Sequence, residues 1–171
     1  MRMILWILTA LVGALLLALL IAALAIPASR SSTQSIVLTG SIDEVWQVYA
    51  DIRSKPEWRS ELSAIRITSE GERPETWVEV NQRGPEVSFS GIAWESPTRL
   101  ELETSAANYF TGSYVAEFEA LGEGKTRGTF TESVTTLGFI PRIMGFLFFN
   151  PRKFIEQYAE EAQAEIERRR Q

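Results

Sequence analysis

The spacing of apolar and polar residues divides the chain into three parts. Residues 4–26 are almost wholly Leu, Ala, Ile and Val, and no charged residue occurs between positions 3 and 29. Residues 35–135 carry short runs that alternate or are β-branched, with turn residues between them, and residues 139–170 return to a helical period. The pattern predicts an apolar N-terminal helix, then a sheet, then a C-terminal helix.

The apolar N-terminal run is long enough to span a membrane. As a helix it would extend roughly 34 Å, against a hydrocarbon core of about 30 Å. A cleaved signal peptide is the alternative, because Ala23-Leu24-Ala25 offers a small-x-small cleavage pattern. Since the apolar part of a signal peptide is normally about 7–15 residues, we expect a retained single-pass anchor over residues 1–29.

The charges beside the anchor are few. Arg2 and the terminal amine precede the span, and Arg30 follows it. This slight positive excess favours a cytoplasmic N-terminus, which would place the rest of the chain on the extracytoplasmic side. We expect a linker at residues 30–34 and one domain over residues 35–171.

The domain begins with a strand and two short helices. Residues 35–40 read as a strand that ends at Gly40, and Ser41 with Glu44 three residues later predicts a helix N-terminus with a capping box. Pro56 disfavours helical geometry at the residue before it, so this helix should end before Pro56 and a second short turn should follow.

Six further strands are predicted, joined by short loops. Loops of this length require antiparallel neighbours, since parallel strands need long crossovers. The predicted strands are residues 64–68, 76–80, 86–94, 99–104, 109–120 and 126–135.

The last predicted element is a long helix that begins near residue 139 and that Pro151 should kink or divide. Its apolar stripe is opposed by glutamates, so one face should pack against the sheet. The stripe consists of Ile155, Tyr158, Ala159, Ala162 and Ile166.

This order of elements resembles the START-like (SRPBCC) helix-grip superfamily, which includes polyketide cyclase/dehydrase-like and Bet v 1-like proteins. The resemblance rests on SIVLTGSIDEVWQVYADIRSKPEW, on FEALGEGKTRGTFTE, and on a C-terminal helix after Leu137-Gly138. It implies an α+β fold in which a curved seven-stranded antiparallel sheet wraps a long C-terminal helix, with the two short helices closing one end. There, Trp46 and Trp58 are expected to pack in the core.

Composition narrows the possible chemistry. Residues 31–171 carry a net charge of −7, since two of the 17 basic residues lie before them, and an acidic domain is poorly suited to nucleic acid. The chain has no His and no Cys, which excludes typical zinc sites, thiol nucleophiles and imidazole bases. We therefore expect no metal and no cofactor.

The resemblance implies an apolar cavity between the sheet and the long helix. Strand parity predicts which side chains point inward, with Val87, Phe89, Gly91 and Ala93 sharing one face, and small residues such as Gly91, Ala116 and Gly128 are expected to leave space there. The residues predicted to contact a ligand are Phe89, Gly91, Leu102, Tyr114, Ala116, Phe130, Met144 and Leu147.

Glu132 is unusual because it shares its predicted face with Phe130 and Val134. An inward carboxyl would have a raised pKa and would be a candidate general acid or base. The alternative is that Glu132 reaches solvent at the strand end or pairs with an arginine, so the sequence assigns no catalytic residue.

Residues 139–149 form the other unusual segment, since they are apolar on nearly every side. Burial, a membrane-surface contact or the mouth of a lipid cavity would each explain this. The leading hypothesis is a membrane-anchored, non-enzymatic binder of a lipid or other hydrophobic small molecule. The alternatives are a cyclase- or dehydratase-like enzyme that uses Glu132 or Tyr114, and an interaction module with a filled core; no protein partner is indicated.

Overall fold

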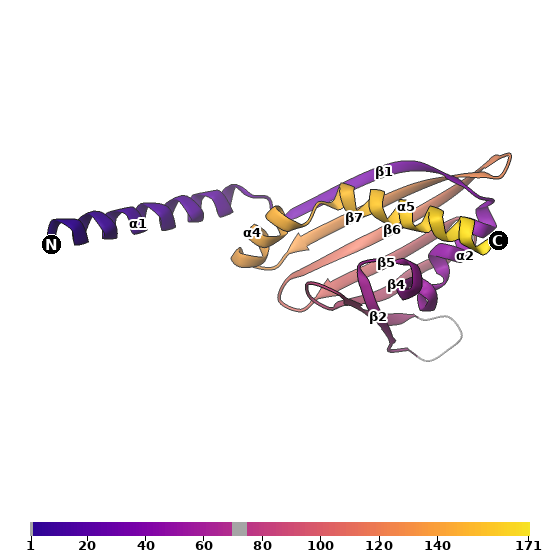
Figure 1. Ribbon diagram of the computed structural model, residues 1–171, viewed down its shortest axis with the longest axis horizontal. Helices are drawn as coiled ribbons and strands as arrows, with labels where there is room; N and C mark the ends of the chain where they lie inside the picture. Colours follow the sequence, from indigo (N-terminus) through magenta and orange to yellow (C-terminus); the bar gives the residue numbers. More distant parts are fainter. Residues whose placement is uncertain (1, 70–74) are drawn as a thin grey trace.

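The computed structural model describes residues 2–69 and 75–171; the side chains of residues 22–24, which belong in part to the predicted cleavage pattern, lie outside that description. An N-terminal helix, α1 (Arg2–Ala25), extends away from a curved sheet whose inner face is covered by helices (Figure 1). Its residues 2–21 are apolar enough to cross a membrane, and their side chains are exposed.

The sheet has seven antiparallel strands in the order β1-β7-β6-β5-β4-β3-β2. The predicted meander is therefore confirmed, and the first strand extends it at one edge by pairing with the last strand. The strands are β1 (Ser29–Thr39), β2 (Leu62–Ile67), β3 (Thr76–Asn81), β4 (Val87–Glu95), β5 (Arg99–Ala106), β6 (Phe110–Gly122) and β7 (Lys125–Thr136).

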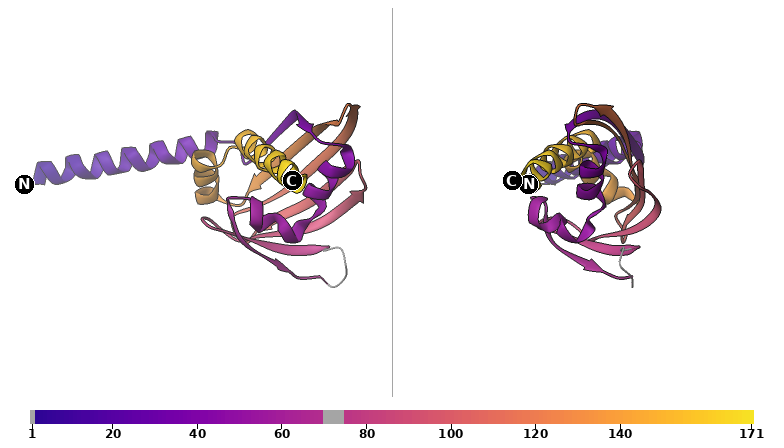
Figure 2. Two further views of the ribbon diagram at one scale, coloured as in Figure 1. Left: turned by 45° about the vertical axis from the view of Figure 1, so that its right-hand side comes forward. Right: turned by 90° about the vertical axis from the view of Figure 1, so that its right-hand side faces the viewer.

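The helices close the inner face of the sheet. Figure 2 shows the sheet curving around the last helix, with the short helices at one end. This arrangement is the predicted α+β helix-grip architecture. The helices are α2 (Ile42–Ala50), the 3-10 helix η1 (Ile52–Ser54), α3 (Lys55–Trp58), α4 (Phe139–Phe148) and α5 (Pro151–Arg169).

Local signals account for the helix boundaries. The Ser41 hydroxyl accepts a hydrogen bond from the Glu44 amide, and the Glu44 carboxylate accepts one from the Ser41 amide, which confirms the capping box. Pro151 starts α5, so it divides the C-terminal helical segment in two. The predicted stripe of α5 is buried throughout.

The first strand begins earlier than expected. Residues 30–34, predicted to form a linker, pair instead with β7, so that three residues separate α1 from β1. On the outer face, hydroxyl pairs join the two strands at 2.8–2.9 Å: Ser29 with Thr135, Ser31 with Ser133, and Thr33 with Thr131. Such cross-strand pairs stabilise a sheet without an apolar pattern, which explains why the sequence resembled a linker.

A bulge in β4 changes one predicted face. The register shifts between Gly91 and Ala93, so that Ala93 pairs with Glu101 and Trp94 pairs with the fully buried Leu100. Trp94 therefore takes the inward position that simple alternation assigned to Ala93, since an extra residue reverses the parity beyond it.

Candidate functional site

Polar side chains gather inside the grip, between the sheet and the helices. Charged residues are rarely buried unless they are paired, so a buried group of them needs an explanation. The structure brings together residues from six elements: Tyr49 of α2, Lys55 of α3 with Arg59 just beyond it, Glu79 of β3, Tyr114 of β6, Glu132 of β7 and Tyr158 of α5. We call these seven residues the interior cluster.

Glu132 faces inward, as the parity of β7 predicted. It lies opposite Tyr114 of β6 and Ser32 of β1, and only 6% of its surface is exposed. Burial raises the pKa of Glu132 to about 8; the positive field of Arg59 lowers it and the Glu79 carboxylate raises it further. With this pKa the carboxyl is mostly protonated at neutral pH, so it can donate a hydrogen bond.

Three tyrosines lie against one another in the cluster. The ring of Tyr158 is 5.1 Å from that of Tyr49 and 5.7 Å from that of Tyr114. Burial raises the pKa of Tyr49 and of Tyr114 well above the usual value, so both hydroxyls stay protonated. The buried hydroxyls of Tyr49 and Tyr158 have no hydrogen-bond partner among the described residues.

Arg59 is the best-paired member of the cluster. Its guanidinium donates to the carboxylates of Glu79, at 3.2 Å, and Glu61, at 3.1 Å. It also lies 4.3 Å from the centre of the Tyr158 ring, which is the geometry of a cation–π contact. Its Nε is buried without a hydrogen-bond partner in the described part of the chain.

Lys55 is buried but lacks an ion-pair partner among the described residues. Its Nζ lies over two aromatic rings, 5.6 Å from the centre of Tyr158 and 5.9 Å from the centre of Trp77. Only 2% of the residue is exposed. Because a largely buried ammonium is costly unless oxygen atoms solvate it, this position favours an oxygen atom from water or a ligand beside Nζ.

The cluster thus presents donors within an aromatic enclosure. The donors are the Lys55 ammonium, the Arg59 Nε–H, the neutral Glu132 carboxyl and two tyrosine hydroxyls. Together they suit a carbonyl, carboxylate or other oxygen acceptor on a molecule with an apolar body. Glu132 has a second capability, since a carboxyl with a pKa near neutrality can exchange protons with a bound molecule.

The predicted ligand residues fall into two groups. Phe89, Gly91, Leu102, Tyr114, Ala116 and Phe130 lie on the inner face of the sheet, as parity predicted. Met144 and Leu147 lie instead on α4, where they are 49% and 63% exposed. These two side chains are therefore separate from the interior cluster.

The small residues do not leave the space expected of them. A Cβ added at Gly128 would lie 2.4 Å from the Phe130 ring, and one at Gly91 would lie 2.2 Å from Trp94. The space beside each glycine is therefore already filled. The ring of Phe130 lies over Gly128, two residues earlier in the strand, and the ring of Trp94 lies over Gly91, three residues earlier.

The sequence interpretation missed Lys55, Arg59, Glu79, Tyr49 and Tyr158 as possible site residues. Glu79 alternates with Trp77 in β3, and this parity was a usable signal for an inward carboxylate. Lys55 and Arg59 had no such signal, since their burial depends on how α3 packs against β3 and α5.

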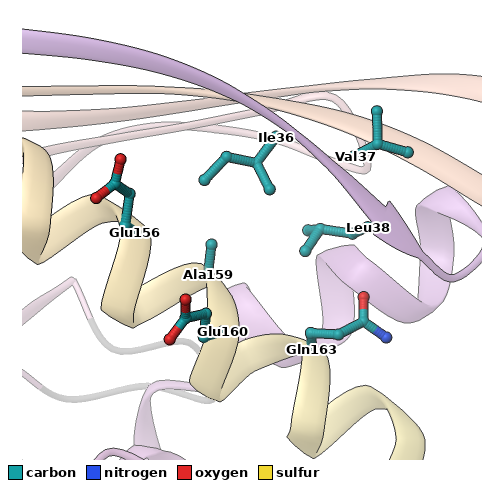
Figure 3. Close-up of a pocket in the computed structure, with 7 residues that line it drawn as sticks. All are labelled: Ile36, Val37, Leu38, Glu156, Ala159, Glu160 and Gln163. Atoms are coloured by element: carbon teal, nitrogen blue, oxygen red, sulfur yellow. The ribbon is translucent and has the colours of Figure 1, made fainter.

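A separate hollow of about 330 Å³ lies at the edge of the grip (Figure 3). It is an open groove between β1 and α5, lined by the apolar side chains of Ile36, Val37, Leu38 and Ala159 and by the polar residues Glu156, Glu160 and Gln163. It shares no lining residue with the interior cluster or with the predicted ligand set.

Comparisons with known proteins identify the fold. No family model and no curated protein matches the sequence. Among solved structures, a START superfamily protein from Mycobacterium smegmatis has a TM-score of 0.68 at 12% identity, covering 81% of this chain and 97% of its own. The Zhui aromatase/cyclase from Streptomyces sp. R1128 has a TM-score of 0.66 at 15% identity, covering 84% and 96% respectively.

A norcoclaurine synthase from Thalictrum flavum is similar over the same region. Its TM-score is 0.65 at 8% identity, and the match covers 84% of this chain and 97% of the synthase. Identities this low show the fold but not the activity. The chain has the helix-grip fold of the START-like (SRPBCC) superfamily.

Proposed function

We propose that this chain is a membrane-anchored domain that binds a hydrophobic small molecule carrying an oxygen acceptor, with the acceptor held by the interior cluster. The observation that carries this proposal is a set of buried donors without hydrogen-bond partners among the described residues: Arg59 Nε and the hydroxyls of Tyr49 and Tyr158. The Lys55 ammonium lies beside them, 5.6 Å from the centre of the Tyr158 ring. A buried donor left unpaired costs about 1–3 kcal/mol, so three of them in one place favour a bound molecule that accepts their hydrogen bonds.

The fold supports a small molecule as the ligand. Structures of the same fold are named an aromatase/cyclase and a norcoclaurine synthase, the latter in complex with a transition-state analogue. Aromatic rings surround the donors here, with Trp77 and Phe89 stacked at 5.2 Å and Tyr49 and Phe130 at 5.3 Å. Because rings fill the space beside Gly91 and Gly128, the ligand would have to displace some of these side chains as it enters.

The anchor in this proposal is α1. Its 24 residues extend roughly 36 Å as a helix, enough to cross a bilayer, and a cleaved signal peptide remains the competing explanation of the same segment. An anchored domain would meet ligands that partition into lipid. The slight positive excess at the N-terminal end of α1, from Arg2 and the terminal amine, favours an extracytoplasmic domain.

The test is mass spectrometry of small molecules that co-purify with the full chain in detergent. The wild type is compared with Lys55→Met, which removes a buried donor, and with Lys125→Met, which removes an exposed lysine at the far hairpin. We expect the wild type and the Lys125 variant to retain the same apolar, oxygen-containing compound, and the folded Lys55 variant to lose most of it. Equal retention by all three proteins would contradict the proposal.

A second candidate function is an enzyme that uses Glu132. The observation in its favour is a carboxyl with a pKa of about 8 opposite Tyr114, which could give a proton to a bound molecule or accept one from it. Here Glu132→Gln should retain the co-purifying compound but abolish its conversion.

If none of the proteins retains a compound, the interior is an ordinary core and the domain acts through its surface.

A further inference from the structure

The helix α4 exposes more apolar surface than a water-soluble helix normally does. None of its ten residues, all of them described, is buried. Ile140 is 70% exposed and Phe148 is 77% exposed, and Phe139, Met144, Phe146 and Leu147 are also exposed. Contiguous apolar surface of this kind usually marks a contact with another molecule or with a membrane.

The position of α4 identifies the surface that it would contact. α4 lies at the end of the domain where α1 joins it (Figure 1). Only residues 26–28 separate α1 from β1, so this end of the domain stays beside any bilayer that α1 spans. At three residues, this connection is too short for the domain to turn its other end to the membrane freely.

Arg30 fixes α4 to this place. Its guanidinium donates to the carbonyl oxygens of Gly145, at 2.5 Å, and Phe149, at 3.0 Å, and it lies 5.9 Å from the centre of the Phe146 ring. Arg30 is the second residue of β1, so a residue that follows α1 closely along the chain holds the last turn of α4. The exposed face of α4 is therefore held in a defined position relative to α1.

Two neighbouring residues extend the same apolar surface. The amide of Leu137 donates to the carbonyl of Tyr109 at 2.7 Å, and both side chains are exposed. Tyrosine is favoured at membrane interfaces, where its ring meets acyl chains and its hydroxyl meets water. The one charged residue of α4, Arg142, is half-buried.

We propose that α4, together with Leu137 and Tyr109, is a second membrane contact that lies in the interface of the bilayer that α1 spans. The occupant of this surface is lipid. The domain's charge of −7 opposes anionic membranes, so the contact is made by apolar side chains rather than by charge. The inference rests on the membrane anchor proposed above but not on the interior ligand.

The absence of cysteine from the chain makes a direct test possible. Full-length single-cysteine variants are labelled with an environment-sensitive fluorophore and reconstituted in phosphatidylcholine vesicles, with and without lipid that carries a nitroxide on its acyl chain. The labelled sites are Phe148→Cys on α4, Leu11→Cys on α1 and Lys125→Cys at the far hairpin. We expect quenching at positions 148 and 11 and none at position 125.

The other outcomes separate the two proposals. Quenching at position 11 without quenching at 148 would overturn the α4 contact and leave the anchor in place. No quenching at position 11 would overturn both. An apolar emission at position 148 without quenching would show that protein covers α4, as in a dimer, and would also overturn the inference.

A second measurement tests the surface as a whole. With the fluorophore at Ile140→Cys, the added pair Phe146→Ser and Phe148→Ser should abolish quenching while circular dichroism of the protein stays unchanged. The matched control is Ile92→Ser, since Ile92 is exposed but lies in β4. Quenching that survives the double substitution would contradict the proposal.

Discussion

At the scale of single residues, the buried carboxyl of Glu132 should make stability depend on pH. Its pKa in the folded chain is about 8, above the ordinary value of 4.5. Between these values the native state holds a proton that the unfolded chain has released. The stabilisation is therefore complete below about pH 4.5 and is lost as the pH rises through 8.

Replacing Glu132 with Gln should flatten this dependence. The free energy of unfolding of the wild type should fall by up to about 1.4 kcal/mol for each pH unit between 5 and 8, relative to the variant. Denaturant unfolding of both proteins in the same detergent, at several pH values from 5 to 9, measures the difference. Parallel profiles would show that Glu132 is ionised in the native state.

Arg59 is the second residue with a distinct expected effect. Arg59→Met removes the partner of the buried Glu79 carboxylate, and breaking a buried pair in this way costs about 3–5 kcal/mol. Adding Glu79→Leu should restore most of the loss, since both charges are then gone. The matched control is Arg66→Met, whose pair with Glu86 is exposed, and whose free energy of unfolding should not change measurably. Equal effects of the two arginine substitutions would contradict the buried pairing.

At the scale of elements, Arg30 couples β1 to α4. The last carbonyls of a helix lack partners within the helix. Here the Arg30 guanidinium donates to the carbonyl of the C-cap residue Phe149 and adds a second hydrogen bond to the carbonyl of Gly145, which also accepts from the Phe149 amide. Arg30→Gln should therefore speed amide hydrogen exchange across residues 139–149 without changing exchange in α5. Arg53→Gln, at an exposed position in η1, is the control and should change neither. Unchanged exchange in α4 would show that Arg30 does not hold it.

At the scale of the whole molecule, the place where the domain begins can be tested by truncation. A chain that starts at Ser29 keeps all of β1, whereas one that starts at Ser35 loses six residues paired with β7 and also loses Arg30. The first should unfold cooperatively, and the second should melt at a lower temperature, by roughly 2–4 °C for each kcal/mol lost. Circular dichroism measures the two melting temperatures. If they are equal, residues 29–34 contribute no stability.

The sequence by itself determined the order and type of the elements. Ser41 with Glu44, Pro56 and Pro151 act within a few residues of themselves, so the helix boundaries that they set could be predicted locally. The same holds for Glu132, which faces inward because alternation along β7 continues without a bulge. In a strand without a bulge, alternate side chains point to the same face, and this alternation was enough to predict that Glu132 faces inward.

The tertiary structure decided what depends on partners distant in the sequence. The start of β1 depends on hydroxyl pairs with residues about 100 positions away, and the inward turn of Trp94 depends on a bulge in β4. Lys55 and Arg59 became interior residues because α3 packs them against Tyr158. The interior cluster was beyond prediction for this physical reason: burial and charge pairing are properties of the assembled core, whereas caps and alternation are properties of the local chain.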